Sequence, residues 1–159
     1  MNPASAREIR KALQNKSQQE LVEACMRLSR FKKENKELLT YFLFESENED
    51  AYVESIKEFI DSEFALLAGK NKYRYLKAVR KILRISKRFI RYSGKKETEA
   101  SILLHFCNVV NDQNNSLKRN QGLLTVFKKQ LEMAEKAIAT LHEDLQYDFQ
   151  SELSSLKAI

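Results

Sequence analysis

Glycine and proline are scarce in this chain. Its 159 residues include only three glycines and one proline. A β-sandwich or barrel needs many turns and a phosphate-binding loop needs clustered glycines, so this scarcity argues against both. Much of the remaining chain is Leu, Lys, Glu, Ala and Gln, which favour helices, and 43% of all residues are hydrophobic, which suffices for a core. The composition therefore predicts an all-α domain.

Long hydrophobic runs are absent as well. The longest apolar segment, LLTYFLF at residues 38–44, is too short to span a bilayer. The beginning, MNPASAREIRKALQ, has no uninterrupted apolar core and does not resemble a secretory signal. We therefore expect a soluble, cytoplasmic protein without a membrane span. The two cysteines, Cys25 and Cys107, are too few for a disulfide framework, and their apolar helical neighbours predict buried, reduced thiols.

Cap and stop signals divide the chain into six to eight helices. The clearest signals are Asn2-Pro3, a capping box of Ser17 and Glu20, Gly69, Asn71 and Gly94. Short turns between helices predict antiparallel neighbours, arranged as a closed bundle or as a short HEAT-like solenoid. We expect one domain over residues 1–150 and a frayed tail at residues 151–159. Residues 36–45 are apolar on all sides, which predicts a central helix packed on both faces.

An apolar residue recurs every seventh position in the last third of the chain. The positions are Leu103, Val110, Leu117, Leu124, Leu131, Ile138 and Leu145. This spacing is typical of a coiled-coil seam, which either packs on its own domain, the interpretation we favour, or dimerises. The polar run at residues 111–116 predicts a loop followed by one long helix to about Gln150, and an uninterrupted helix from Lys96 is the alternative.

Residues 70–96 hold twelve Lys or Arg residues and no Asp or Glu. On a helix, seven of these bases fall at every third or fourth position within an arc of about 100°. We call these seven residues the basic ridge: Arg74, Lys77, Lys81, Arg84, Arg88, Arg91 and Lys95. Arg80 and Lys87 lie just beside it, and apolar residues fill the opposite side. Like charges four residues apart repel on a helix, so another interaction must compensate for the pattern.

Three interpretations of the basic ridge stay open. Residues 45–69 carry eight acids and one base, so flanking acids could pair with the ridge across a helical hairpin, at about 1 kcal/mol or less per exposed pair. The second interpretation is binding to an acidic protein surface, including another copy of this chain. The third is nucleic-acid binding, in which the same cations contact phosphates, although no recognised nucleic-acid module is present. We favour a protein-interaction surface and keep nucleic acid as the alternative.

Three stretches carry a family resemblance. They are LSRFKKENKELLTYFLFES, AYVESIKEFID and AVRKILRISKRFIRYSGKKETE, within residues 18–110. They resemble a family of small helical bacterial proteins without an assigned activity, and the rhythm of helix pairs is similar to HEAT or armadillo repeats. The resemblance implies a helical-hairpin domain that acts as a scaffold or binding surface. It implies no functional residues.

The sequence contains no pattern typical of a catalytic or metal site. His105 and His142 have no second ligand at metal-binding spacing, and the two cysteines have no histidine partners suited to zinc. Cys107 and His105 are two residues apart, so a helix points them in opposite directions and they cannot form a nucleophilic pair. We therefore expect a protein that is not an enzyme and has no metal or cofactor.

Overall fold

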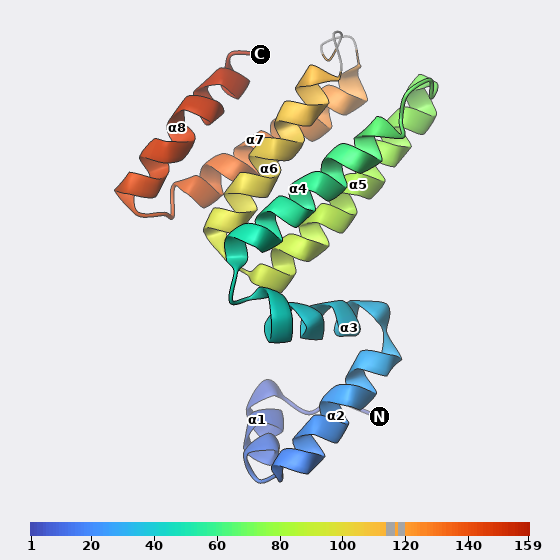
Figure 1. Ribbon diagram of the computed structural model, residues 1–159, viewed down its shortest axis with the longest axis vertical. Coiled ribbons are helices and arrows are strands. Elements are labelled where there is room, and N and C mark those ends of the chain that lie inside the picture. Colours follow the sequence, from blue (N-terminus) through green and yellow to red (C-terminus); the bar gives the residue numbers. More distant parts are fainter. Residues whose placement is uncertain (114–116, 118–119) are drawn as a thin grey trace. The chain divides into compact units, whose positions relative to one another are not determined.

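The computed structural model describes residues 1–113, 117 and 120–159, and this part of the chain is all-α, as the composition predicts (Figure 1). A π-helical turn, η1, covers Tyr41–Glu45. The α-helices are α1 (Ala6–Gln14), α2 (Gln18–Phe31), α3 (Lys33–Thr40), α4 (Glu49–Ala65), α5 (Lys72–Ser93), α6 (Lys96–Asp112), α7 (Gln121–Ile138) and α8 (Glu143–Lys157). In the described ranges, no helix combines the length and the apolar character needed to cross a bilayer.

Side-chain caps explain where several helices begin and end. The predicted capping box of Ser17 and Glu20 is present at the start of α2. A second box, made by Ser5 and Glu8, starts α1 at Ala6, three residues later than the Asn-Pro signal suggests. The side chain of Asn71 accepts a hydrogen bond from the backbone of the third helical residue of α5, and Gly94, with φ of 68°, ends that helix.

The chain divides into two compact units, Met1–Glu45 and Ser46–Ile159, where the sequence suggested one domain over residues 1–150. In the first unit, Tyr41 is buried, whereas Phe42, Leu43 and Phe44 are 60%, 59% and 74% exposed. The predicted central helix at residues 36–45 is therefore wrong. Within this unit, α3 packs against α2. Cys25 is also exposed, contrary to the prediction of a buried thiol.

Helix α6 is the centre of the second unit. It packs against α4, α5, α7 and α8, and the two antiparallel pairs α4–α5 and α6–α7 lie side by side in Figure 1. Several of its side chains are fully buried, among them Leu103, Leu104, Phe106 and Cys107. The rings of Phe64 and Phe106 meet edge to face with centroids 5.7 Å apart. Burial raises the pKa of the Cys107 thiol to about 12, so this cysteine is an inert core residue, as predicted.

The C-terminal part of the chain contains a turn that the sequence analysis missed. Helix α7 ends at Ile138 and α8 begins at Glu143, so the predicted single helix to Gln150 is wrong. His142 adopts an extended conformation and its ring accepts a hydrogen bond from the backbone N–H of Asp144. The amide of Gln146 donates to the carbonyl of Leu141 at 2.7 Å, which satisfies a helix-end acceptor. These local bonds compete with helix continuation.

Five of the seven residues of the seven-residue seam pack inside the second unit, whereas Leu124 and Leu145 are half-buried. Leu103, Val110, Leu117, Leu131 and Ile138 are buried there. The sequence predicts a break at residues 111–116. Helix α6 ends at Asp112 and α7 starts at Gln121, so the break is present but residues 111 and 112 still belong to α6. Residues 114–116 of the predicted loop lie outside the described residues. The tail that we expected to fray at residues 151–159 is helical to Lys157, because Leu153 and Leu156 are buried.

Candidate basic interface

The basic ridge lies on the outer side of α5, which is one uninterrupted helix. Its inner side is buried through Val79, Ile82, Leu83, Ser86 and Ile90. The opposite side is therefore left to the ridge, as the periodicity predicts. Six of the seven ridge residues are exposed: Arg74, Lys77, Lys81, Arg84, Arg91 and Lys95.

Arg88 differs from the other ridge residues because it is half-buried. Its guanidinium carbon lies 5.8 Å from the centroid of the Phe89 ring. That ring in turn meets Phe59 of α4 edge to face. Arg88 is therefore part of the packing between α4 and α5, and the accessible ridge consists of the other six residues.

The acidic segment pairs with the ridge at one end. The Nζ of Lys95 lies 3.1 Å from the Glu49 carboxylate. Within the part of the chain that the structure describes, the five exposed cations before it have no ion-pair partner: Arg74, Lys77, Lys81, Arg84 and Arg91. Neutralisation of the ridge across the hairpin, the first of the three interpretations, therefore reaches Lys95 and leaves these five cations uncompensated.

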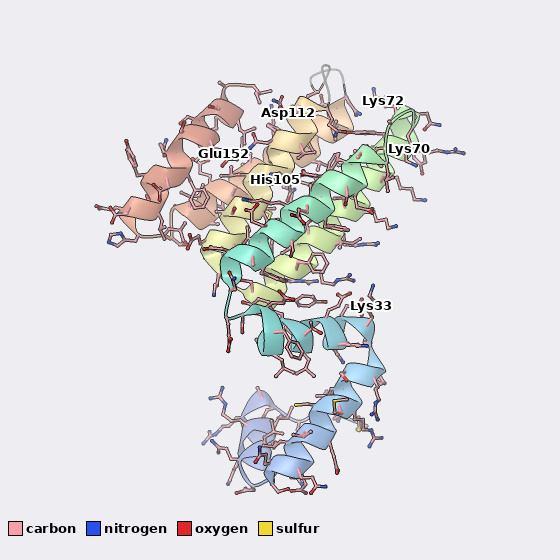
Figure 2. The ribbon with its side chains drawn as sticks, in the orientation of Figure 1. Lys33, Lys70, Lys72, His105, Asp112 and Glu152 are labelled. Atoms are coloured by element: carbon pink, nitrogen blue, oxygen red, sulfur yellow. The ribbon has the colours of Figure 1, made fainter. Side chains whose placement is uncertain are left out.

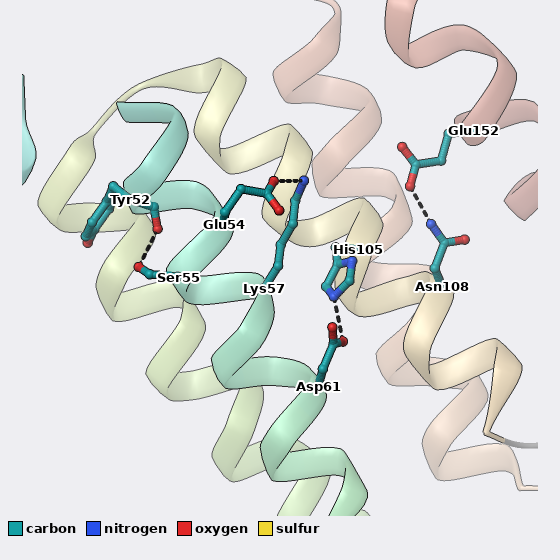
Figure 3. Close-up of polar contacts among 8 residues, drawn as sticks. All are labelled: Tyr52, Glu54, Ser55, Lys57, Asp61, His105, Asn108 and Glu152. Carbon is teal, nitrogen blue, oxygen red and sulfur yellow. Dashed lines mark hydrogen bonds and ion pairs between the residues drawn. The ribbon is translucent and has the colours of Figure 1, made fainter. Parts of the chain in front are cut away.

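The acids of α4 are directed elsewhere. Asp61 pairs with the Nε2 of His105 on α6 at 2.7 Å, and Glu54 accepts a hydrogen bond from Lys57 of its own helix at 2.8 Å (Figure 3). The bond from Lys57 is the main cause of the lowered pKa of Glu54. A small depression of about 290 Å³ beside these residues is lined by Asp50 and Glu54 of α4 and by Glu97 of α6. Lys95, at one end of the ridge, also lines this depression, so the acids of α4 meet the ridge only there among the described residues.

Two depressions accompany the ridge. The first, of about 610 Å³, follows the outer surface of α5. Apart from Ala78, its lining is entirely cationic: Lys70, Arg74, Lys77, Arg80, Lys81 and Arg84. Figure 2 shows Lys70 and Lys72 at the end of the unit where α5 begins, whereas Glu152 lies on α8. Six cations around one surface depression form a site with strong attraction for anions.

The second depression, of about 450 Å³, lies between α5, α6 and α7, and we call it the α5–α7 groove. Its floor is apolar and its edge is basic. The floor consists of Leu83, Ile90, Leu103 and Met133, and the edge of Arg80, Arg84, Lys87 and Arg91, with Glu99 as the one acid in the lining. Glu99 is paired with Lys96 at 2.7 Å. The groove can therefore hold an apolar group that is flanked by negative charge.

Lys87 is the cation nearest the floor of this groove. Its Nζ lies 3.2 Å from the sulfur of Met133, and the side chain is half-buried. Partial burial lowers the pKa of Lys87, nearby Lys129 lowers it further, and Glu99 opposes the change. Removal from water and a second cation both disfavour its charged form, and Glu99 offsets part of this effect.

Comparisons with protein-family models, with curated proteins and with solved structures found no match. The resemblance to a family of small helical bacterial proteins therefore stays a prediction.

Helical periodicity in the sequence predicted the basic ridge but not the α5–α7 groove. Arg80 and Lys87 appeared only as neighbours of the ridge, and nothing in the sequence places Leu103 and Met133 next to α5. Such a site is created by tertiary packing, so helical periodicity cannot reveal it. Elsewhere in the described ranges, no three His, Cys, Asp or Glu side chains gather closely enough to hold a metal ion.

Proposed function

We propose that this protein is a helical interaction domain that binds an acidic surface of another protein through the basic ridge. The observation that carries the proposal is the row of five exposed cations, Arg74 to Arg91, without ion-pair partners in the described residues. Repulsion between neighbouring cations costs a few tenths of a kcal/mol per pair, and nothing in the described part of the chain offsets it. An acidic partner would place negative charge opposite these cations, and the long-range attraction between the two surfaces would speed their association.

The groove beside the ridge favours a protein partner over nucleic acid. Protein interfaces combine apolar anchors with a charged rim, and the α5–α7 groove presents Leu83 and Met133 beside Arg84 and Arg91. Single-stranded nucleic acids, in contrast, bind to surfaces where aromatic rings stack on the bases. The cation-lined depression along α5 has no aromatic residue in its lining. Tyr73, which lies beside Arg74 on α5, is 77% exposed, so a phosphate backbone would gain charge contacts here with one neighbouring ring for stacking.

A binding assay separates these partners. Fluorescein-labelled probes would be an acidic amphipathic peptide of about 20 residues, a single-stranded DNA and a DNA duplex, each at about 50 and 200 mM salt. The ridge variant is Lys77→Glu/Lys81→Glu, and the control is Arg7→Glu/Lys11→Glu on α1. Both pairs are exposed, four residues apart on a helix and identical in charge change.

We expect the peptide to bind the wild type, to bind the ridge variant at least about tenfold more weakly, and to bind the control within about twofold. A peptide that does not bind at about 50 mM salt, or that binds both variants equally, contradicts the proposal. DNA binding with a logarithmic salt slope of roughly −4 to −5, without peptide binding, would favour the nucleic-acid alternative, because about five phosphate contacts predict that slope.

A further inference from the structure

We infer that the α5–α7 groove of one copy receives the outer face of α8 from a second copy, in a head-to-tail contact. This inference rests on the proposed function, because it names the acidic partner of the basic side of the second unit as the chain itself. Two surfaces on different helices support it. Their charges are opposite, and both contain apolar groups.

The receiving surface is the groove. Four cations and one acid line it, and that acid, Glu99, is paired with Lys96. Arg84 and Arg91 are exposed, and no carboxylate of the described residues pairs with either. The floor next to them contains Met133, a flexible side chain that adapts to different apolar groups. An aromatic ring with carboxylates beside it is the group that such a site accommodates.

The outer face of α8 has this chemistry. Tyr147 is 82% exposed, which is unusual for a large aromatic side chain. Glu143 and Asp144 lie four and three residues before it, so they share its side of the helix, and Asp148 follows it. These three acids are exposed. Asp144 lies 3.5 Å from His142, and neither Glu143 nor Asp148 has an ion-pair partner among the described residues.

The packing of α8 holds this face outward. Leu153 and Leu156 are buried against the unit. Glu152 accepts a hydrogen bond from Asn108 of α6 (Figure 3). Lys157 pairs with Glu135 of α7. Tyr147 therefore projects from an anchored helix, and little side-chain entropy is lost when it binds, because a tyrosine has few rotatable bonds.

The two surfaces cannot meet within one chain. Helix α8 packs against α6 and α7, and in Figure 1 it lies on the side of this pair away from α4 and α5. A contact between α8 and the groove therefore joins different copies. Because the two surfaces differ, the contact is heterologous, and each copy keeps one unused groove and one unused α8, so assembly continues into open chains or closes into a ring.

Tyrosine and arginine are the residues that dominate interface energetics, and an arginine can stack on a tyrosine ring. The competing occupant is the acidic side of α4, where Asp50 and Glu58 have no ion-pair partner among the described residues. None of the large exposed apolar side chains of the described residues lies on α4, whereas α8 presents Tyr147. The inference therefore assigns α8 as the occupant, and the experiment distinguishes it from α4.

The test is sedimentation velocity on the full chain and three variants. The groove variant is Arg80→Glu/Arg84→Glu, the α8 variant is Tyr147→Ser/Asp148→Lys, and the control is Glu54→Lys/Glu58→Lys on α4. We expect the wild type and the α4 control to form larger species as concentration rises. The groove variant and the α8 variant should each be monomeric. Mixed in equal amounts, these two should form a dimer and nothing larger, because one intact groove then meets one intact α8.

The mixing experiment also controls for misfolding, because a dimer can form only if the remaining surface of each variant is intact. A wild type that stays monomeric at the highest soluble concentration would overturn the inference. So would an α8 variant that still assembles, an α4 control that is monomeric, or a mixture that fails to dimerise. If the chain is monomeric but the acidic peptide binds the ridge, the proposed function stands and this inference alone is wrong.

Discussion

Glu49 is the polar side chain on which the junction between α4, α5 and α6 depends most. Its carboxylate accepts hydrogen bonds from the hydroxyls of Ser93 and Thr98, the latter at 2.6 Å, and pairs with Lys95 at 3.1 Å. Thr98 is only 2% exposed, so its hydroxyl has little access to water. We predict that Glu49→Ala destabilises the second unit well beyond the usual effect of a surface acid.

The magnitude follows from these contacts. A buried hydroxyl left without an acceptor costs about 1–3 kcal/mol, and this applies to Thr98. Loss of the exposed pair with Lys95 adds less than about 1 kcal/mol. Loss of a carboxylate in the first turn of α4 adds about 0.3–1 kcal/mol, because the helix dipole favours negative charge there. The expected decrease in the free energy of unfolding is about 2–4 kcal/mol.

Asp50→Ala is the matched control. Asp50 is the next residue in the same first turn, it is exposed, and it makes no hydrogen bond or ion pair with the described residues. It should lose only the dipole contribution, about 1 kcal/mol or less. The measurement is urea unfolding followed by helical circular dichroism, together with hydrogen exchange at the start of α6. Equal losses for Glu49→Ala and Asp50→Ala would contradict this prediction. A double-mutant cycle with Thr98→Val should give a coupling of about 1–2 kcal/mol.

Three further predictions concern the core and the helix ends. Phe106→Ala should lower the free energy of unfolding by about 3–5 kcal/mol in urea, because the ring is fully buried against Phe64. Alkylation at about pH 8 followed by mass spectrometry should label Cys25 in the native protein and Cys107 only after unfolding. Burial raises the pKa of Cys107 from its ordinary 9.0 to about 12. The contribution of this pKa difference to the free energy of unfolding is therefore complete below pH 9, and it should be lost as the pH rises from 9 to about 12. Gly94→Ala should cost about 1 kcal/mol, because its φ of 68° is unfavourable for alanine, and a smaller loss with Gly94→Asn would support this cause.

Local chemistry made much of the fold predictable. Helix starts at Ser17 and Asn71 and the end at Gly94 depend on residues next to the boundary, so the sequence alone identifies them. The two faces of α5 were predictable for a similar reason, because apolar and cationic residues alternate with the helical period over its full length. The burial of Cys107 follows from its apolar neighbours on α6.

Features that depend on neighbouring elements could not be predicted in this way. The seven-residue spacing continues from Ile138 to Leu145, but a turn built from the conformation of His142 and the amide of Gln146 interrupts the helix between them. Residues 36–45 are apolar on every side. Such a pattern predicts that the segment is buried, but it does not show whether a second helix is present to pack on it. In the first unit α3 packs against α2, and Phe44 stays exposed.

The distribution of charge in the second unit explains why acids close in sequence leave the ridge uncompensated. Helices α4 and α5 pack against each other, but both also pack on α6, and this third contact decides which side of each helix is covered. The packing of α4 on α6 brings Asp61 to His105. The packing of α5 on α6 leaves Arg84 at the edge of the α5–α7 groove, which also contains Met133 of α7. Opposite charges that would attract each other in an isolated hairpin thus lie on separate sides of the unit. Because exposed pairs contribute only about 1 kcal/mol or less, apolar packing on α6 outweighs their attraction. This packing leaves the exposed ridge cations from Arg74 to Arg91 without a carboxylate partner among the described residues.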